Sequence, residues 1–201
     1  MDFDLGEEQK MFQQAIREFS EKEIAPLVGE AEEKERFPKE LFPRMGKLGY
    51  LCVRYPAKYG GAEMGKLTEC ILVEEVARIC SGIAAAIMVH SGLGSSLIND
   101  HGSEDQKQKF LVPAIRGQKI GSFGLTEPNA GSDAASIQSR ATRDGDSYVL
   151  NGSKIYITNG PIADYVLAVA YTDKSKGSKA GISVLIVEKG TPGFTVARKL
   201  S

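Results

Sequence analysis

Residues 121–133 read GSFGLTEPNAGSD, and this stretch decides how the rest of the chain is interpreted. The segment from Ile120 to Thr126 has the composition of a strand, but Pro128 cannot continue it and the small polar residues that follow favour a loop. An irregular turn of small residues leaves backbone N–H groups uncovered, and such groups bind anions or carbonyl-type acceptors. A flavin ring presents acceptors of this kind; the Thr126 hydroxyl can donate to its N5, and Ser132 can reach a ligand oxygen. From spacing alone, an ordinary polar turn stays open as the alternative.

Outward from this stretch, the pattern of apolar residues changes near residue 118. Before that point apolar residues recur at helical spacing, and after it they alternate and are interrupted by turn signals. We therefore predict an α+β plan: an all-helical domain over residues 1–118, then a small antiparallel, barrel-like β-domain over residues 119–201. The final residues, GFTVARKLS, resemble a strand cut short, so we expect the β-domain to continue past Ser201.

Five helices are expected in the first part. The first begins near Glu7 and is ended or kinked by Pro26, and the second starts at Phe37–Pro38. Ser81 to Ile98 is small and nearly uncharged, which predicts burial on most sides. Ser103 and Gln106 form a capping box for the fifth helix, which ends by Gly117. The third helix is predicted to turn Leu67, Ile71, Leu72, Val76 and Ile79 inward and Glu69, Glu74, Glu75 and Arg78 outward.

Two dipeptides predict two-residue hairpins in the second part, Asp144–Gly145 and Asn151–Gly152, with Ile155 and Ile157 in the returning strand. Further strands are expected near residues 165–170 and 182–187, separated by a polar loop over residues 172–179.

Composition excludes several classes of protein. Lys and Arg number 25 against 26 acidic residues, so no basic surface for nucleic acid or an anionic membrane is indicated. No apolar run approaches the ~20 residues of a membrane span, and the acidic N-terminus lacks the order of a signal peptide. The three cysteines, Cys52, Cys70 and Cys80, are interpreted as buried thiols of a reducing compartment. We expect a cytoplasmic protein without a metal site.

Six motifs occur in an order that resembles the acyl-CoA dehydrogenase family. TEPNAGSD resembles the TEP-x-AGSD signature, and Leu150 to Gly160, LNGSKIYITNG, resembles the L-N-G-x-K-x-W-I-T-N element. The others are the following: Glu23–Pro26; Pro56 with Tyr59–Gly61; His101–Ser103 with Gln106–Lys107; and Glu188–Phe194. The resemblance covers essentially the whole chain, and it makes the plain-turn interpretation of residues 121–133 the weaker one.

The resemblance implies FAD as cofactor, an acyl-CoA as substrate and an electron-transfer flavoprotein as partner. It places Phe123, Gly124, Leu125 and Thr126 along the flavin, with Gly131 and Ser132 completing the loop. Ser132 then faces both cofactor and thioester, and Tyr156, Ile157 and Thr158 lie on the flavin's other side. The family's catalytic glutamate belongs to a C-terminal helical domain absent from this chain, so no catalytic residue is named. The family forms dimers and tetramers, largely through that domain.

The same motifs are compatible with other functions. A flavin oxidase or monooxygenase of the same superfamily, or a non-catalytic fragment, fits the same motifs. Tyr156 stands where the family usually has tryptophan, which keeps an aromatic face but leaves shielding and the electron partner less defined. Glu127 is interpreted as a surface or turn carboxylate. Arg54 is interpreted as a solvated loop residue, with pairing to a charged acyl group as the alternative, and His90 as a satisfied buried histidine, with a place in the acyl pocket as the alternative. The loop of Lys174, Lys176 and Lys179 is interpreted as solvated, with contacts to CoA phosphates as the alternative.

Overall fold

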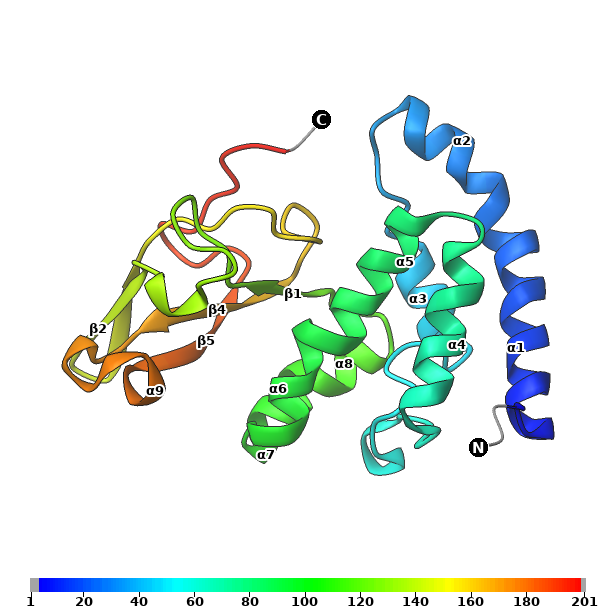
Figure 1. Cartoon of the computed structure of the whole chain (residues 1–201), viewed down its shortest axis with the longest axis horizontal. Helices are drawn as coiled ribbons and strands as arrows, with labels where there is room; N and C mark the ends of the chain where they lie inside the picture. Colours follow the sequence, from blue (N-terminus) through cyan, green and yellow to red (C-terminus); the bar gives the residue numbers. More distant parts are fainter. Residues whose placement is uncertain (1–3, 200–201) are drawn as a thin grey trace. The chain divides into compact units, whose positions relative to one another are not determined.

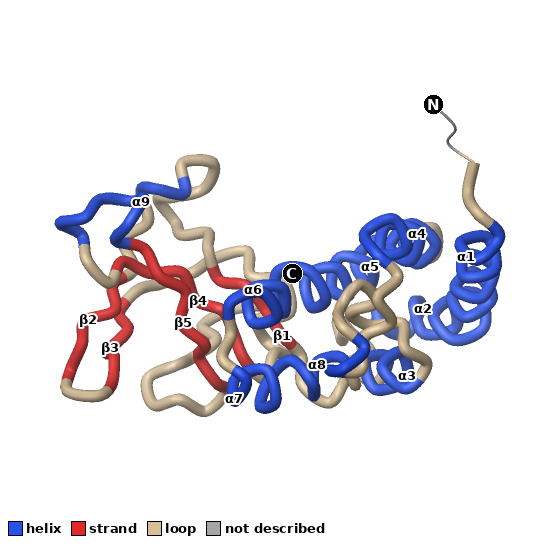
Figure 2. Tube along the Cα trace, turned by 90° about the horizontal axis from the view of Figure 1, so that it is seen from below, coloured by secondary structure: helices blue, strands red, loops and turns tan. Residues whose placement is uncertain are grey.

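The computed structural model describes residues 4–199 and divides the chain into two compact units that meet between Ile120 and Gly121. The first unit is helical, and the second holds all five strands, drawn as arrows in Figure 1 and in red in Figure 2. This order of elements is the predicted one, a helical part followed by a part built on a sheet.

Several helices of the first unit run into one another through π-helical turns. The longest combination joins α1 (Glu7–Phe19), η1 (Ser20–Ile24) and α2 (Ala25–Glu33). The first helix therefore begins at the predicted Glu7, but it does not end at Pro26. The wider turn η1 precedes Pro26, which then occupies the first turn of α2, where a missing N–H is tolerated. The remaining helices before Ser81 are α3 (Leu41–Lys47), η2 (Ala57–Tyr59) and α4 (Gly65–Ala77).

The burial of α4 differs from the predicted pattern at three positions: Leu67, Glu75 and Glu69, whose side chain was predicted to point outward but is only 18% exposed. Ile71, Leu72 and Val76 are buried as expected, but Leu67 is 50% exposed. Glu75, predicted to point outward, is 2% exposed because cationic and amide groups of α1 and α4 surround its carboxylate. Helical spacing alone cannot distinguish a solvated acid from an acid with buried partners.

The small-residue segment forms one long helical run of α5 (Ser81–Met88), η3 (Val89–Leu93) and α6 (Gly94–His101). Contrary to the expectation from sequence, Ser81–His101 is long and apolar enough to cross a membrane by length and composition alone. About half of its apolar window, 56%, is buried inside the fold, and the core helix of a soluble protein passes the same test. Its burial is less complete than predicted, since Met88 and Leu93 are exposed.

The last helical run comprises α7 (Glu104–Gln106), η4 (Lys107–Leu111) and α8 (Val112–Ile115). Its start confirms the predicted capping box, because Ser103 Oγ accepts from the Gln106 amide and the Gln106 side chain accepts from the Ser103 amide. Gly117 follows it with φ +67°. The cysteine prediction was right only for Cys52: Cys80 is partly exposed and Cys70 exposed, and all three are free thiols.

The sheet of the second unit is mixed, not antiparallel as predicted. Its central strand β4 (Tyr165–Tyr171) is buried along its whole length and pairs antiparallel with β5 (Ile182–Glu188). On its other edge β4 pairs in parallel, first with β1 (Gly121–Gly124) and then, at Arg140↔Tyr171, with β2 (Arg140–Asp144). The strand β3 (Ser147–Asn151) completes an antiparallel hairpin with β2. These pairings form an open sheet, so the barrel-like description is not supported.

One predicted hairpin is confirmed and the other is wrong. β2 and β3 turn around Gly145–Asp146, one residue later than the Asp144–Gly145 signal, with Gly145 at φ +58°. At Asn151–Gly152 no hairpin forms, and Ile155 and Ile157 lie outside strands. Gly152 is required for a different reason: a Cβ there would lie 2.1 Å from Ser139 Oγ.

Two smaller expectations also needed correction. The polar loop after β4 contains two short helical turns, η6 (Lys174–Lys176) and α9 (Gly177–Gly181). The closing segment from Thr195 to Lys199 forms no strand, and the end of the predicted strand, Leu200 and Ser201, lies outside the described residues.

Candidate functional site

The TEPNAGSD turn follows β1 directly and is closed by its own backbone. The Glu127 amide donates to the Ala130 carbonyl at 2.9 Å, and the Ala130 amide donates back at 3.1 Å. Pro128 and Asn129 form the exposed tip between them. Proline pre-sets the backbone angle that such a turn needs, so the sequence folds here as a tight, reciprocally bonded turn.

Glu127, interpreted from sequence as a surface or turn carboxylate, is buried with 5% exposure. Its Oε2 accepts from the Gln138 amide at 2.6 Å. Its Oε1 accepts from the Ser139 amide at 3.1 Å, from Ser139 Oγ at 2.5 Å and from Lys154 Nζ at 2.6 Å. Burial raises the pKa of Glu127, but the hydrogen bonds from Lys154, Ser139 and Gln138 outweigh it and lower the pKa to about 2.

Lys154 connects the turn to the second predicted cofactor segment. Its ammonium group also donates to the Leu125 carbonyl at 3.0 Å, and the next residue, Ile155, donates its amide to the Thr126 carbonyl at 2.9 Å. Farther along, Ser122 Oγ donates to the Thr158 carbonyl at 2.6 Å. The structure therefore brings the predicted segments 123–126 and 156–158 together. No hydrogen bond ties Gly131 or Ser132 to either segment within residues 4–199.

Several donors of the turn remain uncommitted. The Thr126 hydroxyl, the Ser132 hydroxyl and the backbone amides of Gly131 and Ser132 donate to no other described residue. Gly131 and Ser132 are exposed, and Thr126 is partly exposed. This is the donor set that the sequence predicted for carbonyl-type or anionic acceptors.

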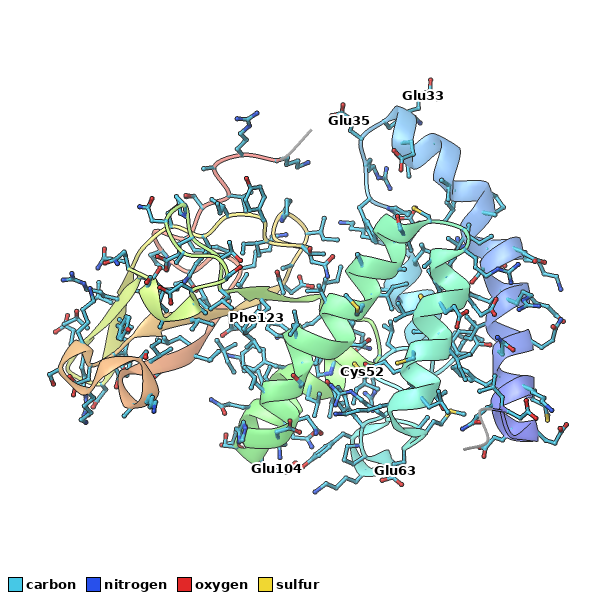
Figure 3. The ribbon with its side chains drawn as sticks, viewed as in Figure 1. Glu33, Glu35, Cys52, Glu63, Glu104 and Phe123 are labelled. Atoms are coloured by element: carbon cyan, nitrogen blue, oxygen red, sulfur yellow. The ribbon has the colours of Figure 1, made fainter. Side chains whose placement is uncertain are left out.

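The side chains of Phe123 and Leu125 have a second role, since they pack against the core cluster of Ala130, Ile137, Val169 and Tyr171. Figure 3 labels Phe123 on β1. At Gly124 a Cβ would lie 3.2 Å from Val166 Cγ1, so close packing of β1 on β4 favours glycine there. These residues hold the shape of the strand that leads into the turn.

Tyr156 is the most unusual residue of the second segment. Its φ is +56°, a left-handed conformation that is costly for a residue with a Cβ, and its side chain is 70% exposed. Backbone strain of this kind clusters at functional sites. Asn159, three residues later, also has a positive φ of +67°. Ile157 is partly exposed and Thr158 exposed.

Sequence reasoning missed the residues that hold the two segments together. Lys154 and Ser139 were given no role, and Glu127 was assigned to the surface. A signal was present: an acid inside a loop of small residues and a lysine between two apolar stretches are both candidates for a buried pair. Spacing alone could not show that they meet.

The remaining candidates lie apart from this turn in the chain. His90 is buried, and its Nε2 lies 3.1 Å from the Ala114 carbonyl oxygen; burial lowers its pKa to about 4, which confirms a satisfied core histidine. Arg54 is not solvated: it pairs with Glu69 at 3.0 Å, and each side chain is less than one-fifth exposed, at 19% and 18%. Its charge is therefore already neutralised. Among the residues that the structure describes, no group of three metal-binding side chains is present.

The chemistry of the turn fits an oxidised flavin ring. Such a ring presents nitrogen and carbonyl acceptors, and the turn presents hydroxyl and amide donors. The nearest buried carboxylate, Glu127, accepts hydrogen bonds from four protein donors, so its negative charge is already compensated. Asp133 bonds the Ser136 hydroxyl.

The chain thus consists of a helical unit followed by a unit with a mixed sheet, whose first strand leads into a turn with uncommitted donors. Models of the acyl-CoA dehydrogenase N-terminal domain and middle domain match residues 6–118 and 122–201, respectively. The chain belongs to the acyl-CoA dehydrogenase family.

Individual relatives agree with this assignment. The short-chain-specific acyl-CoA dehydrogenase of Clostridium acetobutylicum is 48% identical over 98% of this chain and 52% of its own length. A structure described as the electron transferring flavoprotein of Acidaminococcus fermentans has TM-score 0.90 and 42% identity, covering 96% of this chain and 50% of that one. A Mycobacterium smegmatis glutaryl-CoA dehydrogenase in complex with FADH2 has TM-score 0.88 and 35% identity, covering 98% and 50%. The chain thus spans about half the length of the relatives it matches.

Proposed function

We propose that this chain forms the cofactor-contacting front part of an FAD-dependent acyl-CoA dehydrogenase. The reaction is α,β-dehydrogenation of an acyl-CoA thioester, with electrons passed to an electron-transfer flavoprotein. Family membership and the names of the relatives support the activity, and the short-chain-specific relative favours a short acyl group. We also propose that the protein is cytoplasmic and that the full-length protein forms a homodimer or homotetramer.

The observation that carries the proposal is the free donor set of the TEPNAGSD turn beside the Ile155–Thr158 segment. The Thr126 hydroxyl and the amides of Gly131 and Ser132 have no other described partner, while the rest of the turn is fixed by hydrogen bonds. Preorganised donors bind an acceptor without a further cost of ordering them.

Within this proposal, Phe123 to Thr126 and Tyr156 to Thr158 would hold FAD, which when bound would accept the hydride removed from the substrate. The Thr126 hydroxyl would donate to a ring acceptor, and Tyr156 would offer an aromatic face. Ser132 donates to the cofactor or to the thioester carbonyl, and a donor at that carbonyl makes the neighbouring α-proton more acidic.

The proton-abstracting base is assigned to no residue of this chain. Glu127, the carboxylate of the signature motif, accepts four hydrogen bonds, and its pKa of about 2 makes it a poor base. It is also buried on the inner side of the turn. Glu127 is therefore given a structural role in this proposal and not that of the base.

An anaerobic absorbance experiment on the full-length protein tests the proposal. Purified protein loaded with FAD should absorb in the visible, and butyryl-CoA should bleach this absorbance. A flavin that stays oxidised with acyl-CoA substrates favours the oxidase or monooxygenase alternative. A full-length protein that takes up no FAD contradicts both, and the chain would then act as a non-catalytic module.

A further inference from the structure

The side chain of Glu127 does more than the turn around it requires. The turn is already closed by the two backbone hydrogen bonds between Glu127 and Ala130. The carboxylate instead accepts hydrogen bonds from Gln138 and Ser139, which directly precede β2. It also accepts one from Lys154, which precedes the second cofactor segment. One buried group thus joins its own turn to two other stretches of chain, at residues 138–139 and at Lys154.

Lys154 extends this contact. Its side chain is 15% exposed, and its ammonium group donates both to Glu127 at 2.6 Å and to the Leu125 carbonyl at 3.0 Å. Leu125 precedes the uncommitted Thr126 hydroxyl by one residue, and Lys154 precedes the strained Tyr156 by two. The ion pair therefore fixes the spacing between the two segments next to the Thr126 hydroxyl on one side and next to Tyr156 on the other.

We infer that Glu127 is a positioning residue that, through Lys154, Gln138 and Ser139, sets the Thr126 hydroxyl and the Tyr156–Thr158 segment in fixed register toward one ligand. The identity of that ligand as FAD rests on the proposed function. The positioning itself rests only on the hydrogen bonds of Glu127 and Lys154.

The carboxylate cannot be replaced by its neutral isostere without loss. Oε1 accepts from Lys154 and twice from Ser139, while Oε2 accepts from the Gln138 amide. A glutamine has one acceptor oxygen and one NH2 group, so either orientation places N–H against N–H or O–H. Glu127→Gln therefore keeps the size of the side chain and breaks the contact.

Hydrogen–deuterium exchange and FAD titration of the full-length protein test this inference. In the cofactor-free protein, Glu127→Gln should speed exchange at least tenfold in peptides covering residues 121–133 and 152–160, with β4 unchanged. The dissociation constant for FAD should rise at least tenfold, and the visible circular dichroism of the bound flavin should change. Asp146→Asn and Lys189→Met, both at exposed positions, are the matched controls and should behave as wild type.

Lys154→Met is the second variant, and it serves if Glu127→Gln fails to fold. It leaves the Gln138 and Ser139 contacts in place, so exchange should rise over residues 152–160 but not over 137–139. Exchange rates and FAD affinity within twofold of wild type in either folded variant would overturn the inference.

The two proposals fail in different ways. A wild-type protein that takes up no FAD contradicts the proposed function, while the exchange comparison, which needs no cofactor, still decides whether Glu127 holds the segments. A protein that binds FAD but is not reduced by acyl-CoA contradicts the proposed substrate and leaves the affinity comparison intact.

Discussion

The guanidinium group of Arg17 donates two hydrogen bonds to the carboxylate of Glu75, from Nη2 to Oε1 at 2.8 Å and from Nε to Oε2 at 3.0 Å. This bidentate ion pair connects α1 to α4. Arg78 and Gln13 each add one hydrogen bond of 2.9 Å to the same carboxylate. Bidentate arginine pairs are among the stronger charge-assisted contacts in proteins. The two helices lie side by side in Figure 1.

Glu75→Gln should destabilise the helical unit by about 1–3 kcal/mol, because it removes a buried charge whose partners stay behind. The lower part of that range is expected, since Arg17 is 39% exposed and water screens its charge. Urea unfolding followed by the helical circular dichroism signal measures the change. Glu74→Gln, at an exposed position of the same helix, is the control and should fall within about 0.5 kcal/mol of wild type.

The same pair predicts a pH dependence. Hydrogen bonds from Arg17, followed by those from Arg78, outweigh burial and lower the pKa of Glu75 from 4.5 to about 2. A group whose pKa is depressed by folding stabilises the protein above its unfolded value and loses that contribution as pH falls. The difference in stability between wild type and Glu75→Gln should be constant above about pH 5 and shrink between pH 4.5 and about 2. A difference that grows on acidification would contradict this assignment.

Two glycines of the helical unit should respond to alanine in opposite ways. At Gly46 in α3, a Cβ would lie 2.2 Å from the Arg116 carbonyl carbon, so Gly46→Ala forces backbone apart and should cost about 1–3 kcal/mol or more. At Gly29 in α2, nothing lies within 4 Å, so Gly29→Ala should stabilise by about 0.5–1 kcal/mol. Thermal unfolding of both variants decides whether close approach, rather than helix propensity, explains Gly46.

Thr126→Val should weaken FAD binding by about two- to tenfold, the effect of one neutral hydrogen bond. Unfolding of the cofactor-free protein should be unchanged, because the hydroxyl donates to no described residue. Thr142→Val, on β2 at an exposed position, is the matched control. Equal FAD dissociation constants for wild type, Thr126→Val and Thr142→Val would show that the Thr126 hydroxyl does not contact the cofactor.

Tyr156→Ala separates binding from stability. Because Tyr156 is 70% exposed, loss of its ring should change the free energy of unfolding by less than about 0.5 kcal/mol. If the ring packs on the flavin, the fluorescence of bound FAD should rise and its affinity should fall. Tyr148→Ala, with 50% exposure on β3, should leave both unchanged. A loss of stability in Tyr156→Ala without a flavin effect would assign the residue to the fold instead.

Local chemistry explains which parts of the fold were predictable. The capping box at Ser103 and Gln106 and the turn at Gly145 depend on a few neighbouring residues; the first forms at the predicted residues and the second one residue later. Asn151–Gly152 carries the same type of signal, yet no hairpin forms there, and the glycine is needed because Ser139 packs too close to leave room for a Cβ. A dipeptide cannot show which of these two uses of glycine applies.

Long-range partners explain what was missed. Glu75 and Glu127 were both placed outward because carboxylates are usually solvated, and each is buried by cations 58 and 27 residues away in the chain. The mixed sheet was missed for the same reason, since the parallel pairing of β1 with β4 joins strands separated by two others. The motif residues of the candidate site were identified by resemblance, and their support by Lys154 became visible only in the structure.

The shared edge of β4 has a consequence for how this protein can diversify. β1 ends opposite Ala168 and β2 begins opposite Tyr171. The segment between them, residues 125–139, contains the TEPNAGSD turn, and its two ends lie on the same edge of β4, three residues apart along that strand. Its ends are thus only about 10 Å apart. Closing a longer loop between such ends costs little extra entropy. Insertions at the exposed tip near Pro128 and Asn129 can therefore change what the turn recognises while the sheet keeps its register, so new specificities can evolve without a new scaffold.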